Sequence, residues 1–137
     1  MLKHSQARPM SQHETLGKLE INAIQGRKLR NCETFSKQDP YLTYKLGESR
    51  GRTKTNRNGG TNPTWNEVTL LDVTPKTYKL RLRAYDDDLI GKDCIGEGTI
   101  DVSPAICKGE LDGWFPIYSN SQLAGEVYLE FTFLRKV

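Results

Sequence analysis

The sequence LRLRAYDDDLIGKD, residues 80–93, joins an alternating apolar pattern to a dense group of carboxylates. In residues 80–84 leucine or alanine alternates with arginine, which predicts a β-strand with one apolar face. Four aspartates then fall within eight residues, at positions 86, 87, 88 and 93. Like charges about 4 Å apart repel by roughly 1 kcal/mol per pair in water. A hard divalent cation would offset this repulsion, because Ca²⁺ takes about six to eight oxygen ligands, many of them from aspartate. A solvated acidic turn is the alternative.

Length and composition predict one soluble globular domain. The chain has 137 residues, of which 36% are hydrophobic and 27% are charged, which is enough for one packed core. No apolar run approaches the roughly 18 residues of a membrane span, and the first residues lack the apolar segment of a secretory signal. The three cysteines occur without Cys-x-x-Cys spacing. This argues against a zinc site or a disulfide framework and favours a reducing, cytoplasmic location.

The net charge of +3 conceals two segments of opposite sign. Residues 45–57 carry five lysines and arginines against one glutamate, whereas acidic residues gather at 86–93. This separation predicts one surface for an anionic partner and another for a cation. Nucleic acid is not the expected anionic partner, because the aromatic residues that stack on bases are sparse in residues 45–57.

Turn signals at short intervals predict about eight strands after a flexible polar tail at residues 1–16. Ser103 followed by Pro104 is typical of an N-cap and first helical residue, so one short helical turn is expected near 104–108. The pattern predicts an all-β protein, an eight-stranded antiparallel β-sandwich over residues 17–137. The strands are expected at 18–24, 41–46, 52–55, 65–71, 78–85, 94–102, 114–118 and 126–134.

Five short motifs follow one another along the chain, namely Lys37-Gln38-Asp39-Pro40-Tyr41, Asn62-Pro63-Thr64-Trp65-Asn66-Glu67, Tyr85-Asp86-Asp87-Asp88, Asp93-Cys94-Ile95-Gly96 and Trp114-Phe115-Pro116. Together they resemble the C2 domain, a β-sandwich with Greek-key connections that binds calcium and phospholipid. The second motif is highly specific, and the resemblance covers residues 17–134. C2 domains occur in two circularly permuted forms. Only one strand is predicted before the first acidic loop, which implies type II, with 126–134 in the place of an extra N-terminal strand.

The resemblance implies a Ca²⁺ site between the first and third loops. The family usually has another aspartate six residues before the one in Asp-Pro-Tyr, and this chain has Glu33 there, one methylene longer. The third loop is also one residue shorter than is common. Both departures keep an alternative open, a C2-type adaptor that binds a protein partner without calcium. The ligands implied by position are Glu33 and Asp39 from the first loop and Asp86, Asp87, Asp88 and Asp93 from the third, with main-chain carbonyls near Asp87 completing the shell.

The resemblance also implies a headgroup site on a concave sheet face. Cations at alternate strand positions face one way and can converge on one phosphorylated headgroup. A solvated basic edge that discourages aggregation is the alternative interpretation. Thr43 stands where a lysine is expected, and the corresponding residues are Tyr41, Lys45, Arg52 and Lys54.

The expected partner is an anionic phospholipid membrane that contains phosphatidylserine or a phosphoinositide. Phe35 in the first loop and Leu89 and Ile90 in the third are expected to enter it once calcium cancels the loop charge. Asp-x-Asp after an apolar strand also resembles the metal site of phosphatases and glycosyltransferases, but those folds need βα units and a longer chain. The sequence therefore predicts a non-enzymatic cytoplasmic module that associates peripherally with membranes when calcium rises.

Overall fold

Eight strands and one short helix make up the computed structural model, which describes residues 14–88 and 91–137. The elements are β1 Gly17–Arg27, β2 Pro40–Leu46, β3 Ser49–Arg52, β4 Thr64–Val73, β5 Lys79–Asp88, β6 Gly91–Asp101, α1 Ser103–Lys108, β7 Glu110–Ser119 and β8 Gln122–Arg135. The predicted all-β fold with one short helix is confirmed. Among the described residues no helix is long and apolar enough to cross a membrane. Of the predicted tail, residues 1–13 lie outside the described part.

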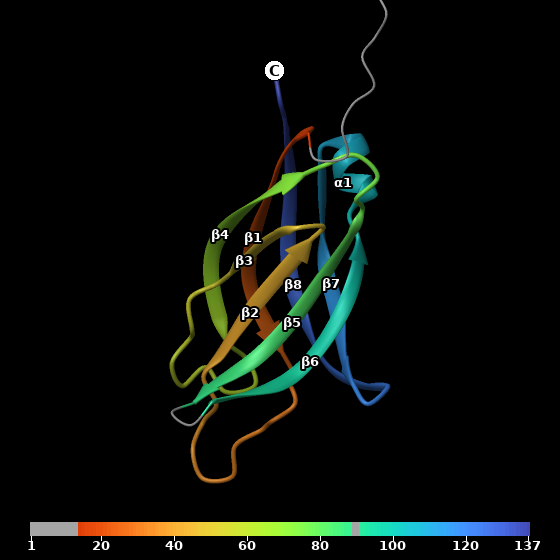
Figure 1. Ribbon diagram of the computed structural model, residues 1–137. Coiled ribbons are helices and arrows are strands. Elements are labelled where there is room, and N and C mark those ends of the chain that lie inside the picture. Colours follow the sequence, from red (N-terminus) through yellow and green to blue (C-terminus); the bar gives the residue numbers. More distant parts are fainter. Residues whose placement is uncertain (1–13, 89–90) are drawn as a thin grey trace, which may run out of the picture.

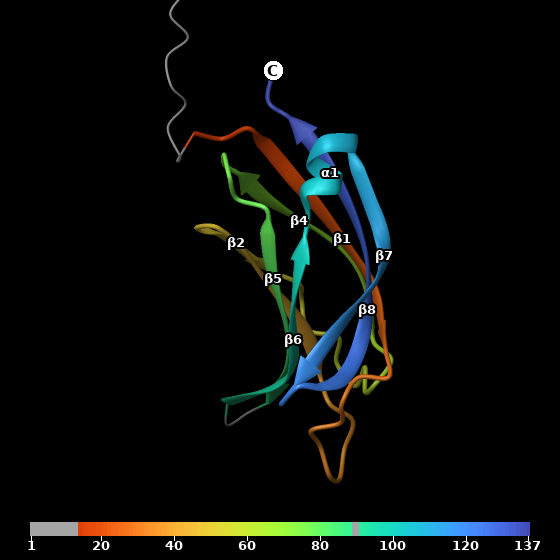
Figure 2. The ribbon, with the colours of Figure 1, turned by 90° about the vertical axis from the view of Figure 1, so that its right-hand side faces the viewer.

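The strands pair antiparallel in the order β3-β2-β5-β6-β7-β8-β1-β4. Within the described ranges, β6 and β7 pair at one position, Glu97 opposite Tyr118. The strands on either side of this narrow junction form two layers, which Figure 2 shows nearly edge-on. The far edges of the layers, β3 and β4, also meet. There Ser49 Oγ accepts a hydrogen bond from the Asp72 N–H at 2.9 Å, so the predicted β-sandwich is confirmed.

β8 lies between β7 and β1, with Arg135 opposite Gly17 at one end and Glu126 opposite Arg27 at the other. This is the place that the sequence predicts for residues 126–134. Residues 1–13, where the other permuted form would have its extra N-terminal strand, lie outside the described residues.

Inward-facing residues of the two layers form one core, as the period-two pattern predicts. In β5, Leu80, Leu82 and Ala84 are fully buried, whereas Arg81 is exposed on the other face. Residues of the facing layer, such as Phe131 of β8, close the core from the opposite side. Burial stabilises each such leucine or phenylalanine by about 1.5–3 kcal/mol, so the alternating strands supply most of the driving force for this fold.

Two details of the sequence prediction are wrong. β3 spans Ser49–Arg52 rather than 52–55, because Thr53 ends the strand by offering its side-chain oxygen to the Leu42 N–H at 3.0 Å. Ser103 is the first residue of α1 and not its N-cap. Its N–H donates to Asp101 Oδ1 at 2.9 Å, so the aspartate satisfies an N–H at the helix start.

Three connections meet at one end of the sandwich, opposite α1 and the C-terminus (Figure 1). We call residues 28–39, between β1 and β2, loop 1, and residues 53–63, between β3 and β4, loop 2. Loop 3 is the β5–β6 connection with the strand ends that flank it, residues 86–93. The calcium ligands predicted from the sequence all lie in loop 1, with Glu33 and Asp39, or in loop 3, with the four aspartates at 86, 87, 88 and 93.

Candidate metal site and basic face

Asp86 continues the inward-facing row of β5 beyond the apolar core. Its side chain is only 1% exposed, because position 86 has the same parity as positions 80, 82 and 84. One oxygen, Oδ1, accepts a hydrogen bond from the Asp39 N–H at 2.7 Å. The other, Oδ2, is buried and has no hydrogen-bond partner among the described residues. An unpaired buried polar atom costs about 1–3 kcal/mol or more when charged, so a cation next to Oδ2 would offset this cost.

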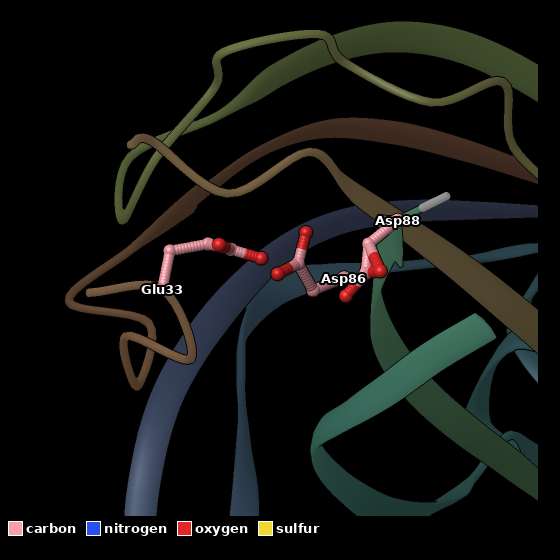
Figure 3. Close-up of side chains that lie close together, drawn as sticks. All are labelled: Glu33, Asp86 and Asp88. Atoms are coloured by element: carbon pink, nitrogen blue, oxygen red, sulfur yellow. The ribbon is translucent and has the colours of Figure 1, made fainter. Parts of the chain in front are cut away.

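Glu33, Asp86 and Asp88 come together at this point. One oxygen from each lies within 4.8 Å of the other two. Figure 3 shows the Glu33 side chain reaching from loop 1 toward Asp86, with Asp88 on the other side of Asp86. Ligands on opposite sides of Ca²⁺ lie about 4.6–5.2 Å apart, since Ca–O distances are about 2.3–2.6 Å. The three oxygens are therefore close enough together to belong to one Ca²⁺ coordination sphere.

The crowding of these carboxylates raises the pKa of Glu33. The first cause is a hydrogen bond with Asp86, which only the protonated Glu33 carboxyl can donate. Loss of hydration and the charges of Asp86 and Asp88 act in the same direction, while a hydrogen bond from Ser36 at 3.4 Å opposes them. A cation placed among the three carboxylates would remove the repulsion that makes this site unfavourable when all three are ionised.

Asp39 and Asp87, two other predicted ligands, lie outside this cluster and face loop 2. Asp39 Oδ1 accepts the Asn58 N–H at 2.7 Å, and Asp87 Oδ2 accepts from Thr55 Oγ1 at 2.9 Å. Arg57 lies between them, with Nη1 3.6 Å from Asp39 Oδ2 and Nη2 3.3 Å from Asp87 Oδ2. Asp87 points this way because alternation along β5 sends it to the face opposite to that of its neighbours.

Asp93 stands directly opposite Asp86 in the β5–β6 ladder. Its side chain is exposed, and it is not one of the three residues whose oxygens lie within 4.8 Å of one another. The structure thus brings Glu33, Asp86 and Asp88 together and places Asp93 beside them. The shorter third loop is compatible with this arrangement, since the ladder continues to Asp88 opposite Gly91.

Gln38, which the sequence does not single out, anchors loop 1. Its side chain is fully buried. Nε2 donates to the carbonyls of Arg30 and Gly60, and Oε1 accepts the Cys32 N–H, all three at 3.0 Å. This one side chain therefore ties both ends of loop 1 to each other and to loop 2. Its only sequence signal is its position beside Asp-Pro-Tyr.

Of the residues predicted to enter a membrane, Phe35 has a completely exposed side chain (100%) in loop 1. Exposure of a whole phenyl ring removes it from the core and offers the fold no burial energy. Leu89 and Ile90 lie outside the described residues.

The concave sheet face carries more cations than the sequence alone predicts. Arg50 of β3, Lys45 of β2 and Arg81 of β5 form a row in which neighbours are directly opposite one another. They line a depression of about 380 Å³. Its other lining residues are Thr43, Tyr44, Gly51, Arg52, Arg83, Tyr85 and Lys92.

Of the two aromatic rings near this basic face, Tyr85 lines the depression, whereas Tyr41, predicted to contact the headgroup, is buried and does not line it. Tyr41 and Tyr85 stack with centroids 5.5 Å apart. The guanidinium of Arg52 lies 3.8 Å from the centroid of Tyr41, and Lys92 Nζ lies 4.5 Å from that of Tyr85. Lys54, also predicted here, follows the end of β3 and does not line the depression.

The sequence does not predict all of these cations as one cluster, because they come together only when β3, β2 and β5 pair in this order. Arg81 and Arg83 alternate with core residues in the sequence, which places them on one face. Only the pairing of β5 with β2 brings that face beside Lys45. Arg83 is also held by Glu97 at 3.1 Å, and this hydrogen bond is the first cause of its raised pKa.

Comparison with known proteins agrees with the observed fold. The chain is 24% identical over 119 residues to 16 kDa phloem protein 2 of Arabidopsis thaliana, covering 85% of this chain and 81% of that protein. It is 26% identical over 121 residues to ingression protein fic1 of Schizosaccharomyces pombe, covering 87% of this chain but 44% of that protein, so the chain spans less than half of its length. A solved C2 domain of plant Extended Synaptotagmin 1 superposes with a TM-score of 0.78 at 17% identity, covering 91% of this chain and 99% of that one. The family model of the C2 domain matches residues 17–117, and the chain belongs to the C2 domain family.

Proposed function

We propose that this C2 domain binds anionic phospholipid membranes in response to calcium, through loops 1 and 3. C2 domains are in general non-catalytic binding modules. The observation that carries the proposal is the buried, unpartnered Oδ2 of Asp86 beside oxygens of Glu33 and Asp88. A donor set made of carboxylate oxygens suits a hard cation such as Ca²⁺ rather than a soft one such as Zn²⁺.

Each acidic residue has a distinct role in this proposal. Asp86 is the fixed ligand, since burial and the hydrogen bond from Asp39 hold its carboxylate in place. Glu33 and Asp88 approach from loop 1 and from the end of β5. Bound Ca²⁺ would supply positive charge and open coordination positions for lipid phosphate oxygens. Cancelling the charge of the loops would also let exposed Phe35, together with Leu89 and Ile90, approach an anionic surface and enter its apolar layer.

The test is calcium titration by calorimetry combined with co-sedimentation on vesicles that contain phosphatidylserine. Asp86→Asn should abolish both the heat of calcium binding and the calcium-dependent part of vesicle binding. Asp112→Asn, which removes the same charge from an exposed position on β7, should behave like the natural sequence. If the natural sequence gives neither calcium heat nor calcium-dependent sedimentation, the proposal is wrong and a calcium-independent adaptor that binds protein becomes the better hypothesis.

A second ligand is favoured by the basic face, which we propose binds a phosphorylated lipid headgroup. Like charges directly opposite in a sheet destabilise it, on a scale of roughly 0.2–1 kcal/mol per pair, and Arg50, Lys45 and Arg81 form two such pairs. A headgroup with several phosphates would convert this repulsion into attraction. Arg81→Gln should weaken binding to phosphoinositide vesicles more than to phosphatidylserine vesicles, whereas Lys108→Gln, on α1, should change neither. Equal loss on both lipids would indicate a nonspecific basic patch.

A further inference from the structure

We infer that Arg57 is a resident cation of the acidic loops and limits this domain to a single calcium ion. The inference rests on the proposed calcium site and adds to it the number of ions that the site holds. It concerns the carboxylates of Asp39 and Asp87, which belong to the predicted ligand set but lie outside the cluster formed by Glu33, Asp86 and Asp88.

The first step is the position of the Arg57 guanidinium. Nη1 faces Asp39 Oδ2 at 3.6 Å, and Nη2 faces Asp87 Oδ2 at 3.3 Å. One cation thus bridges a carboxylate from loop 1 and a carboxylate from loop 3, which is what a second metal ion between these loops would do. Because the arginine is part of the chain, its local concentration at this position does not depend on the calcium level.

The second step is that loop 2 holds both carboxylates in this direction. Asn58, next to Arg57 in the chain, donates its N–H to the other oxygen of Asp39 at 2.7 Å. It does so from a left-handed conformation, φ 57°, which asparagine tolerates better than most residues. Thr55 donates to Asp87 Oδ2 at 2.9 Å. A metal ion bound to Asp39 and Asp87 would have to displace the guanidinium and also compete with these two hydrogen bonds.

The third step is electrostatic. A divalent cation held by Glu33, Asp86 and Asp88 already repels a second one nearby, and a fixed positive charge on Arg57 adds to this repulsion. The arginine side chain is 67% exposed, so it is weakly held and its removal should leave the fold intact. Removing it should change the capacity for calcium much more than the structure of the domain.

The experiment counts calcium ions by calorimetry on the full chain at low ionic strength. The natural sequence should bind one ion and Arg57→Gln should bind two, the second more weakly than the first. Arg135→Gln is the matched control, because it removes the same charge from the end of β8 that lies away from the acidic loops, and it should still bind one ion. Without metal, in EDTA, Arg57→Gln should lower the melting temperature by about 1–4 °C, since Asp39 and Asp87 lose their shared counter-charge.

The results separate this inference from the proposed function. Two or more ions bound by the natural sequence, or a count that stays at one in Arg57→Gln, would overturn the role of Arg57 and leave the calcium site standing. Absence of calcium binding in every variant would overturn the calcium site, and the inference with it.

Discussion

Replacing Gln38 should loosen loop 1 without altering any acidic residue. Gln38→Leu keeps a side chain of similar size but removes the donor to the Arg30 and Gly60 carbonyls and the acceptor for the Cys32 N–H. Each lost hydrogen bond weakens folding by about 1 kcal/mol when the site is partly reached by water. Three such bonds predict a loss of about 3 kcal/mol in the free energy of unfolding, or about 8–12 °C in melting temperature for a chain of this size.

The calcium affinity should fall as well, because loop 1 carries Glu33 and would have to be ordered when the ion binds. If about 1.4 kcal/mol of the loss appears as this ordering cost, the dissociation constant for calcium rises about tenfold. Urea denaturation in EDTA measures the first effect, and calorimetry with calcium measures the second. Gln25→Leu is the control, since it makes the same exchange at an exposed position on β1 and should change stability by less than about 0.5 kcal/mol.

Two results would refute this reasoning about Gln38. A variant as stable as the natural sequence would mean that the three hydrogen bonds do not hold loop 1. A less stable variant with unchanged calcium affinity would mean that the geometry of loop 1 does not matter for the metal site, and the assignment of Glu33 as a ligand would fail with it.

Three further predictions concern the core, the basic face and the loop tip. Tyr44→Phe removes a buried hydroxyl without a hydrogen-bond partner among the described residues and should raise the free energy of unfolding in urea by about 1 kcal/mol. Burial raises the pKa of Tyr44, so this tyrosine ionises in the unfolded chain at a lower pH than in the folded one. The free energy of unfolding should therefore fall above pH about 10, and it should fall less in Tyr44→Phe than in the natural sequence. An equal fall in the two proteins would count against a buried hydroxyl. Lys45→Gln relieves repulsion with both Arg50 and Arg81 and should raise the melting temperature at low salt while weakening phosphoinositide binding; an unchanged melting temperature would mean that the row is already neutralised. Leu89→Ser/Ile90→Ser should remove about 2–4 kcal/mol of calcium-dependent vesicle binding, most clearly at high salt, with little change in calcium affinity measured without lipid; full binding at high salt would show that docking is purely electrostatic.

The sandwich could be predicted from the sequence because strands such as β5 alternate buried and exposed residues and most strands end near turn signals. The parity of β5 also indicates that Asp86 faces the core side and Asp87 the opposite side. The alternation of residues along a strand does not predict the direction in which the side chain of a loop residue points. Glu33 joins the cluster only because loop 1 is folded around Gln38, and that fold depends on hydrogen bonds to residues as far away as Gly60.

The position of Arg57 between two carboxylates also could not be predicted from the sequence. Arg57 belongs to the basic segment of residues 45–57, in which other members, such as Lys45 and Arg52, line the depression on the basic face. Only the packing of loop 2 against loops 1 and 3 separates it from them and places it between two carboxylates. Charge runs in a sequence therefore identify which charges are available, whereas the tertiary fold decides which of them meet.

β5 explains how one strand can serve the core, the acidic loops and the basic face at once. Its inward positions bury Leu80 and Leu82, which stabilises the fold by about 3–6 kcal/mol in total, and then reach Asp86 where the core ends. Its outward positions carry Arg81 and Arg83, and the repulsion between Arg81 and Lys45 of β2 costs roughly 0.2–1 kcal/mol. The unpartnered oxygen of Asp86 adds about 1–3 kcal/mol. Because the apolar term is the larger one, the strand remains stable while Asp86 and Arg81 hold unfavourable charge on its two faces. Under the proposed function, each of these two charges becomes favourable when a ligand of opposite sign binds the folded domain.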